Sequence, residues 1–255
     1  MSQELLIDVH DNVMWLTINR PERRNAITVS VLKALTEAID DANRRRELRA
    51  IVLTGSGNQA FCAGADLRHD PAFRFDYSDP HSYSANLFRR ARAGTLPLIA
   101  RVNGACLASG MGLLAMCDMA VASDKATFAL PEVRVGLFPA QVLTVLQHLI
   151  GRRKLAELCI TGDAIPAEEA LQIGLVNTVA ADFDRALDAL LARVRDKSPA
   201  AIRRGLYLMK HIQHMPFEES MAFTESQIGL LALTDDAREG QEALAEQRKP
   251  RFTGH

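Results

Sequence analysis

The sequence has no excess of charge of either sign. Its 255 residues carry 30 Lys and Arg against 31 Asp and Glu, which gives a formal net charge of −1 at pH 7. Nucleic acids and anionic membrane surfaces attract basic proteins, so this balance argues against both as partners. A chain of this length buries a sizeable core. We therefore expect a globular protein whose partner is a small molecule.

Closely spaced cysteines and long apolar runs are also missing. No C-x-x-C spacing occurs among Cys62, Cys106, Cys117 and Cys159, which predicts reduced thiols. No stretch reaches the roughly 18 to 20 uninterrupted apolar residues that span a bilayer, because the longest one is broken by Arg101, Asn103 and Asp118. The first ten residues show no basic region before a long apolar run. These absences predict a cytoplasmic protein that binds no membrane.

In the first half of the chain, strand patterns alternate with helix patterns. Apolar alternation predicts strands at 5–10 and 13–19, joined as a hairpin through Asp11 and Asn12. A helix is predicted over 28–46 behind a capping Thr28. The segment 68–94 is rich in Asp, Pro and Ser but also contains Phe and Tyr, which predicts a long lid or binding loop. Further strands are expected at 50–55, 96–104, 119–123 and 126–130.

After about residue 141 the strand signal fades and helical spacing takes over. The pattern predicts an α/β protein with a β-rich core followed by a helical C-terminal part. Helices are expected at 141–150, 153–160, 166–173, 182–195, 199–213, 217–233 and 235–247.

The segment ASGMGLLA (108–115) contains a G-x-G-x-x-A pattern, which is also the fingerprint of dinucleotide-binding folds. Glu132 lies near the offset at which such folds place an acidic residue for the ribose. Only LLAMCD separates the glycines from the next strand, whereas a crossover between parallel strands needs about a dozen residues. We therefore favour another role for these glycines. A helix that begins in small residues leaves its first backbone amides free to bind a ligand.

A second turn of the same kind lies in QAFCAGADL (59–67), where Gly64 allows an unusual backbone conformation. Two such amides, one from each turn, would stabilise negative charge that develops on a thioester oxygen.

Six stretches together resemble the crotonase superfamily, also known as the enoyl-CoA hydratase/isomerase family. They are INRPERRNAI (18–27), AIVLTGSGNQAFCAGADL (50–67), PLIARVNGACLASGMGLLAMCDMAVAS (97–123), FALPEVRVGLFP (128–139), LCITGDAIPAEEALQIGLVNTV (158–179) and DDAREGQEALAEQRKPRF (235–252). The resemblance implies that residues 1–195 form a crotonase-like spiral core of ββα turns, and that this core binds acyl-CoA. It also implies a helical C-terminal region over 196–255, for trimerisation and pocket cover, in a homotrimer or homohexamer.

The same resemblance assigns residues to the site. The oxyanion-hole amides fall on Ala65 and Ser109, and Glu132 falls on a catalytic glutamate. Coenzyme A is part of the substrate, so no further cofactor is implied. We also predict no metal, because the closest histidines, His211 and His214, have no cysteine or carboxylate at a familiar spacing. Binding of the CoA ester is assigned to Arg24, near the phosphates, and to Ala63, Gly64, Asp66, Leu67, Gly110, Gly112 and Phe138.

One carboxylate of the family pattern is missing. Hydratases of this family hold water between two glutamates, and the first of these positions is Gly112 here. A single carboxylate suits an isomerase, which moves a proton from the carbon next to the thioester to the carbon two positions along. Dienoyl-CoA isomerisation is disfavoured, because its additional acidic position falls on Ala140. Hydration stays open if water is oriented by Glu132 alone, by the backbone around Gly112, or by Asp70, Asp76 or Asp79.

Other classes of function also stay open. The chain could be a catalytically weak CoA-binding or assembly subunit that kept the fold without the chemistry. It could carry out another crotonase-type reaction such as decarboxylation. A nicotinamide-linked oxidoreductase is the alternative that the glycine pattern by itself suggests.

Overall fold

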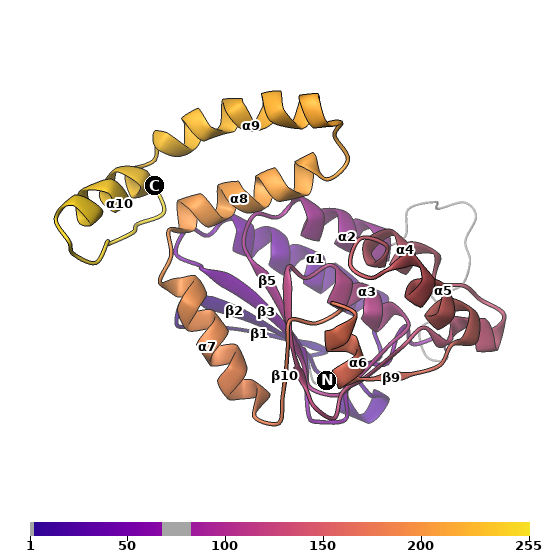
Figure 1. The fold of residues 1–255 in the computed structure, drawn as a ribbon. Helices are drawn as coiled ribbons and strands as arrows, with labels where there is room; N and C mark the ends of the chain where they lie inside the picture. Colours follow the sequence, from indigo (N-terminus) through magenta and orange to yellow (C-terminus); the bar gives the residue numbers. More distant parts are fainter. Residues whose placement is uncertain (1–2, 68–82) are drawn as a thin grey trace.

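The structure is a computed structural model that describes residues 3–67 and 83–255. Asp70, Asp76 and Asp79, the loop carboxylates considered for hydration, lie outside the described residues. The strands form two sheets. Figure 1 shows helices packed around the strands and a separate set of helices at the C-terminal end.

The larger sheet has six strands in the order β1-β2-β3-β5-β7-β10. All neighbouring strands are parallel except the hairpin pair β1 and β2. Its strands are β1 (Leu5–His10), β2 (Val13–Ile18), β3 (Ala50–Gly55), β5 (Leu98–Val102), β7 (Met119–Ser123) and β10 (Thr178–Ala180).

The smaller sheet has the order β4-β6-β8-β9, and only its last strand is antiparallel. After each of β3, β5 and β7 the chain passes directly into a strand of this second sheet. The alternation of one strand in each sheet, followed by helical structure, is the ββα spiral that the resemblance implies. The strands are β4 (Ala60–Cys62), β6 (Ala105–Leu107), β8 (Thr127–Ala129) and β9 (Ile165–Pro166).

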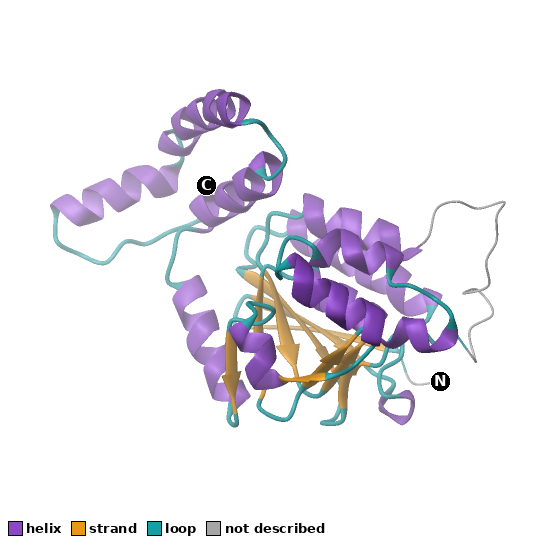
Figure 2. Ribbon diagram, turned by 45° about the vertical axis from the view of Figure 1, so that its right-hand side comes forward, coloured by secondary structure: helices purple, strands orange, loops and turns teal. Residues whose placement is uncertain are grey.

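Helices cover the sheets, as Figure 2 shows. The α-helices are α1 (Val29–Arg44), α2 (Tyr83–Ala93), α3 (Ser109–Ala115), α4 (Ala140–Leu146), α5 (Arg152–Thr161), α6 (Ala167–Gln172), α7 (Phe183–Arg195), α8 (Pro199–Ile212), α9 (Phe217–Ala232) and α10 (Asp235–Ala245). The described residues also form two short 3₁₀ helices, η1 (Pro21–Arg23) and η3 (Pro131–Val135).

The central strand β3 is buried over its whole length, because helices pack on both faces of the large sheet. Leu32 and Leu35 of α1 belong to the main core cluster on one face. Leu187 and Leu191 of α7 pack on the other face, in a second cluster with residues of β2, β3, β5 and β7. A continuous apolar strand such as AIVLTG is typical of a parallel sheet covered on both sides.

Local signals in the sequence explain the first elements. Asp11 and Asn12 have φ values of 51° and 62°, the left-handed pair that a two-residue hairpin turn requires. The Thr28 hydroxyl accepts a hydrogen bond from the Val31 amide at 3.2 Å and so caps α1. The predicted hairpin and helix start are therefore confirmed.

Two predictions about secondary structure were wrong. The segment 68–94 is not a loop throughout, since 83–93 forms α2. Leu87 and Ala91, one helical turn apart, are both buried there, and this packing outweighs the polar composition. The region after residue 141 also contains the short strands β9 and β10. Strands of two and three residues carry no detectable periodicity and form only because a sheet edge is available.

The helices α9 and α10 lie beyond α8, away from the sheets, in both views (Figures 1 and 2). Lys210 fastens α8 to the core through an ion pair with Asp118 at 3.1 Å and a hydrogen bond to the Gly94 carbonyl at 2.9 Å. No residue of α9 is buried. The domain boundary between 195 and 196 stays a prediction. Within the described part of the chain, no helix has the length and apolarity needed to cross a membrane.

Candidate active site

The predicted site residues follow three neighbouring strands of the smaller sheet. β4, β6 and β8 run parallel, with Cys62 opposite Cys106 and Cys106 opposite Phe128. The carboxyl ends of parallel strands meet at the same edge, where ligands bind in open α/β sheets. The segments that follow these strands, 63–67, 108–112 and 130–132, are therefore brought together at one edge.

The first turn, which follows β4, is held by hydrogen bonds on both sides of Ala65. The Gly64 carbonyl accepts from the Ile27 amide at 2.8 Å, and the Asp66 amide donates to the Ile27 carbonyl at 2.9 Å. The Ala63 amide donates to the Arg24 carbonyl at 3.1 Å. No acceptor for the Ala65 amide occurs among the described residues. Hydrogen bonds therefore hold the turn on both sides of Ala65 and leave the Ala65 N–H without an acceptor in the described part of the chain.

The second turn, which follows β6, contains a strained residue. Ala108 has φ 52° and ψ −121°, a conformation that L-residues rarely adopt and that often marks functional sites. Its own amide donates to the Ala129 carbonyl at 3.0 Å. The next residue, Ser109, begins α3, and its amide also lacks an acceptor within the described part of the chain. The first amides of a helix have no partner inside the helix.

The two turns touch each other. Gly64 has φ 99°, and a Cβ atom added there would lie 2.9 Å from the Ala108 Cβ and 3.7 Å from the Ser109 nitrogen. At Gly110, a Cβ would lie 2.4 Å from the Cys62 carbonyl oxygen, so only glycine lets α3 approach β4 this closely. The glycine pattern at 110–115 therefore serves close packing of the turns.

Glu132 follows β8 and lies in the first turn of η3. Its Oε2 atom is buried and has no hydrogen-bond partner within the described part of the chain. Burial raises the pKa of this carboxyl, and a hydrogen bond from its own backbone opposes the rise only in part. A buried oxygen without a partner is costly, and such groups concentrate at functional sites.

Gly112 lies one helical turn after Ser109 on α3 and is buried. A Cβ atom there would lie 2.6 Å from the Phe88 Cζ and 3.2 Å from the Val142 Cγ2. The space beside Gly112 is therefore filled with hydrocarbon from α2 and α4. Sequence reasoning missed Phe88, because the segment around it was expected to be a loop.

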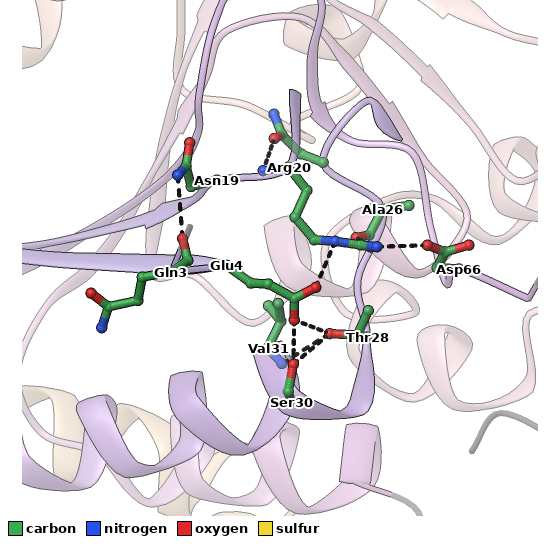
Figure 3. Close-up of polar contacts among 10 residues, drawn as sticks. Gln3, Glu4, Asn19, Arg20, Ala26, Thr28, Ser30, Val31 and Asp66 are labelled. Atoms are coloured by element: carbon green, nitrogen blue, oxygen red, sulfur yellow. Dashed lines mark hydrogen bonds and ion pairs between the residues drawn. The ribbon is translucent and has the colours of Figure 1, made fainter. Parts of the chain in front are cut away.

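A buried ion-pair network, which sequence reasoning also missed, braces the first turn (Figure 3). Figure 3 shows the Arg20 guanidinium between the carboxylates of Glu4 and Asp66, at 2.9 Å and 2.8 Å. The Asp66 and Arg20 side chains are only 6% and 10% exposed. Glu4 also accepts from Thr28, the cap of α1, at 2.9 Å. These partners are far apart in the sequence, so no local motif indicates the network.

The remaining predicted binding residues lie at the surface. Arg24 is exposed and borders a cleft of about 140 Å³, in which the Ser56 hydroxyl is buried without a partner among the residues described. Leu67 and Phe138 are 57% and 53% exposed. All the predicted site residues are described. The structure collects Ala63 to Leu67, Ser109 to Gly112 and Glu132 at the strand ends.

The cysteine beside the first turn is not ionised, and the described residues hold no cluster of metal ligands. Burial raises the pKa of the Cys62 thiol, beside the first turn, to about 12, so this thiol stays protonated at neutral pH. Within residues 3–67 and 83–255, no group of three or more His, Cys, Asp and Glu side chains could hold a metal ion.

A larger cavity, of about 650 Å³, lies at the C-terminal end of α1 and is lined by several arginines. Arg203 there donates to the Asn43 and Arg45 carbonyls at 3.1 Å and 2.8 Å, so it satisfies the carbonyl groups that end α1. A helix of 16 residues is about 24 Å long, which separates this cavity from the Ala65 turn near the start of α1. We place the candidate active site at the strand ends.

The architecture is that of the crotonase fold. An enoyl-CoA hydratase structure from Bacillus anthracis matches with a TM-score of 0.93 at 27% identity, over 99% of this chain and 100% of that one. An enoyl-CoA hydratase structure from Mycobacterium smegmatis matches with a TM-score of 0.90 at 32% identity, over 98% of this chain and 99% of that one.

Sequence comparison agrees with the structural matches. The family model described as Enoyl-CoA hydratase/isomerase matches residues 8–255. The 2,3-dehydroadipyl-CoA hydratase of Escherichia coli K12 is 32% identical over 98% of this chain and 99% of its own length. The crotonyl-CoA hydratase of Syntrophomonas wolfei is 30% identical over 98% of each chain. The chain belongs to the enoyl-CoA hydratase/isomerase family and is an enzyme of that family.

Proposed function

We propose that the enzyme binds an enoyl-CoA and stabilises its thioester oxygen as an enolate between the amides of Ala65 and Ser109. The observation that carries this proposal is the contact of two turns, each of which leaves one amide without an acceptor among the described residues. Such donors are oriented before the reaction, so they stabilise developing charge without reorganising, and loss of one typically costs about 3 kcal/mol of barrier.

Glu132 is the proposed acid and base. As a carboxylate it removes a proton from the carbon next to the thioester, and the C–H electron pair moves into the enolate. The protonated Glu132 then returns this proton to the carbon two positions along, while the electrons of the enolate move the double bond and restore the thioester carbonyl. No water is consumed. Burial supports this role, because a raised carboxyl pKa brings the acid and base forms closer in energy near neutral pH.

The CoA part of the substrate is assigned to the residues around the first turn. Arg24 is exposed beside the small cleft and is the proposed contact for phosphate. Ala63, Gly64, Asp66 and Leu67 follow on the same turn. The Asp66 carboxylate is paired with Arg20, so its proposed part is to hold the turn in place. Phe138 is the proposed apolar contact for the acyl group.

Two reactions of the family use this machinery. We infer that proton transfer within the acyl chain is the main one, because Glu132 has no second carboxylate at Gly112 to help it hold a water. Addition of water is the second candidate, and the names of the E. coli and S. wolfei relatives favour it.

Replacement of Glu132 by Gln tests the proposal. General acid–base catalysis contributes about 10²- to 10⁴-fold to a rate, so we expect Glu132→Gln to lower kcat by about this factor. The assay supplies crotonyl-CoA and a 3-enoyl-CoA separately and identifies the products by mass, because only hydration adds a water. The matched control is Glu168→Gln, an exposed glutamate in the first turn of α6, which should keep full activity.

Turnover that is unchanged in Glu132→Gln would contradict the assignment of Glu132. A wild-type protein that binds CoA esters but turns over neither substrate would instead indicate a binding or assembly subunit. Binding of NAD without binding of any CoA ester would indicate an oxidoreductase.

A further inference from the structure

The atoms nearest to the side-chain position of Gly112, one turn after Ser109 on α3, are carbons of Phe88 and Val142. Gly112 lies three residues after Ser109 on α3, which is about 4.5 Å along the helix and on nearly the same face. The ring of Phe88 reaches this face, with its Cζ 2.6 Å from the position that a Cβ on residue 112 would take. The acyl carbons of a thioester held by Ser109 must therefore pass close to Phe88.

Phe88 is held in place by its own helix. Its neighbours Leu87 and Ala91 on α2 are fully or nearly buried, and α2 packs against α1 and α4. Phe88 itself is partly buried against the main core cluster. Val142 of α4 borders the same space, with its Cγ2 3.2 Å from the built Cβ. An ordered water needs two to four polar partners, and these two side chains offer none.

We propose that Phe88 is the specificity-determining residue of this site. With Val142 it places hydrocarbon in the space beside Gly112, where a polar side chain or an ordered water would otherwise stand. The substrate class that suits such a wall is an enoyl-CoA that undergoes proton transfer along its acyl chain. This inference rests on the proposed function, in which Glu132 and the two amides perform the chemistry.

The test is a set of variants at the two positions. Gly112→Glu alone should gain no hydration of crotonyl-CoA, because the ring occupies the space for its side chain. Phe88→Ala alone opens the space and should lower turnover of the 3-enoyl-CoA. The double variant Gly112→Glu with Phe88→Ala should hydrate crotonyl-CoA faster than Gly112→Glu by about tenfold or more, a factor within the range that one pocket contact controls.

A smaller substitution tests the contact itself, should the glutamate variants fail to fold. Gly112→Ala should lower Tm in the wild-type background and should lower it much less in the Phe88→Ala background. The matched control is Phe183→Ala. Phe183 is also a partly buried ring against a core cluster, but it lies on α7 with the Arg101 guanidinium 4.5 Å from its centre. Its loss should reduce Tm without changing the ratio of hydration to isomerisation.

The outcomes separate this inference from the proposed function. Full hydration by Gly112→Glu alone, or no gain in the folded double variant, would overturn the role of Phe88. If Glu132→Gln still abolishes isomerisation in that case, the proposed function stands. Turnover that does not depend on Glu132 would overturn both.

Discussion

At the scale of single residues, Glu132 shows how a costly placement can serve chemistry. Its Oε2 atom is buried without a partner among the described residues, and burial raises its pKa. A carboxylate in this position is less stable than one in water, because it has lost hydration without gaining a compensating charge. Burial of the Glu132 carboxylate therefore has two effects: it makes the group a better base, and it lowers the stability of the folded chain.

This cost predicts a pH-dependent difference in stability. Because the folded pKa of Glu132 lies above its ordinary value of 4.5, the folded chain holds the proton more tightly than the unfolded chain. Stability is then lost as pH rises through this window, and the penalty is complete above the folded pKa. Glu132→Gln removes the penalty. We expect this variant to be more stable than wild type at pH 7, because a neutral amide loses less hydration on burial than a carboxylate does.

Urea unfolding of both proteins as a function of pH checks this prediction. The difference should shrink as pH falls below the folded pKa and disappear below about 4, because the wild-type carboxyl is then protonated in both states. A variant that is less stable than wild type at pH 7 would show that Glu132 has a stabilising partner.

At the scale of elements, the two turns after β4 and β6 are matched to each other. Gly64 has a positive φ, and it leaves just enough room for the strained Ala108. Strain of this kind costs about 1 to 3 kcal/mol and persists only where the surrounding structure holds it. Here the hydrogen bond from Ala108 to the Ala129 carbonyl and the approach of Gly110 to the Cys62 carbonyl hold it.

The matched turns predict a strong effect of Gly64→Ala. The added Cβ would lie 2.9 Å from the Ala108 Cβ and would be strained at φ 99°, so we expect a loss of about 1 to 3 kcal/mol in the free energy of unfolding. kcat should fall as well, because the shift moves the Ala65 and Ser109 amides apart. Urea unfolding and single-substrate kinetics measure the two effects.

Gly205→Ala is the control for this substitution. Gly205 lies inside α8 with no atom within 4 Å of an added Cβ. Alanine is the better helix former, so this variant should gain about 0.5 to 1 kcal/mol and keep its activity. If Gly64→Ala behaved in the same way, the two turns would not be in tight contact.

At the scale of the whole molecule, the helices α8 to α10 expose apolar side chains. Ile228 and Leu233 of the α9 region are 69% and 71% exposed, and Leu244 of α10 is 80% exposed. Apolar side chains gathered on one part of a surface are typical of interfaces between subunits. The homotrimer or homohexamer expected from the sequence stays a prediction, and this surface is where we expect the subunits to meet.

Charged substitutions test whether the subunits meet at this surface. The double variant Ile228→Asp with Leu233→Asp should shift the protein from an oligomer to a monomer, because two carboxylates would be desolvated in each interface. Light scattering after size-exclusion chromatography measures the mass. The control variant Ile160→Asp, at a 67% exposed position on α5, should keep the mass of the wild type. A wild-type chain that is already monomeric at micromolar concentration would contradict the prediction.

Much of the fold follows from short-range patterns. The Asp11-Asn12 hairpin, the Thr28 cap and the helices from α4 to α10 are set by turn residues, capping groups and apolar spacing, and these act within a few residues of each other. The helix α2 and the strands β9 and β10 were not predictable in this way. They form because a core or a sheet edge is available, and that is a property of distant parts of the chain.

The same distinction between local patterns and distant contacts applies to the candidate site. Motifs in register along the whole chain determined the family, the residues of the two turns and the position of Glu132, because each is a local arrangement of glycine, small residues and a single acid. Only the tertiary structure decided that Arg20 joins Glu4 to Asp66, that the two turns touch, and that Phe88 fills the space beside Gly112. These contacts join residues far apart in the chain, and their geometry exists only once the sheets and helices have packed.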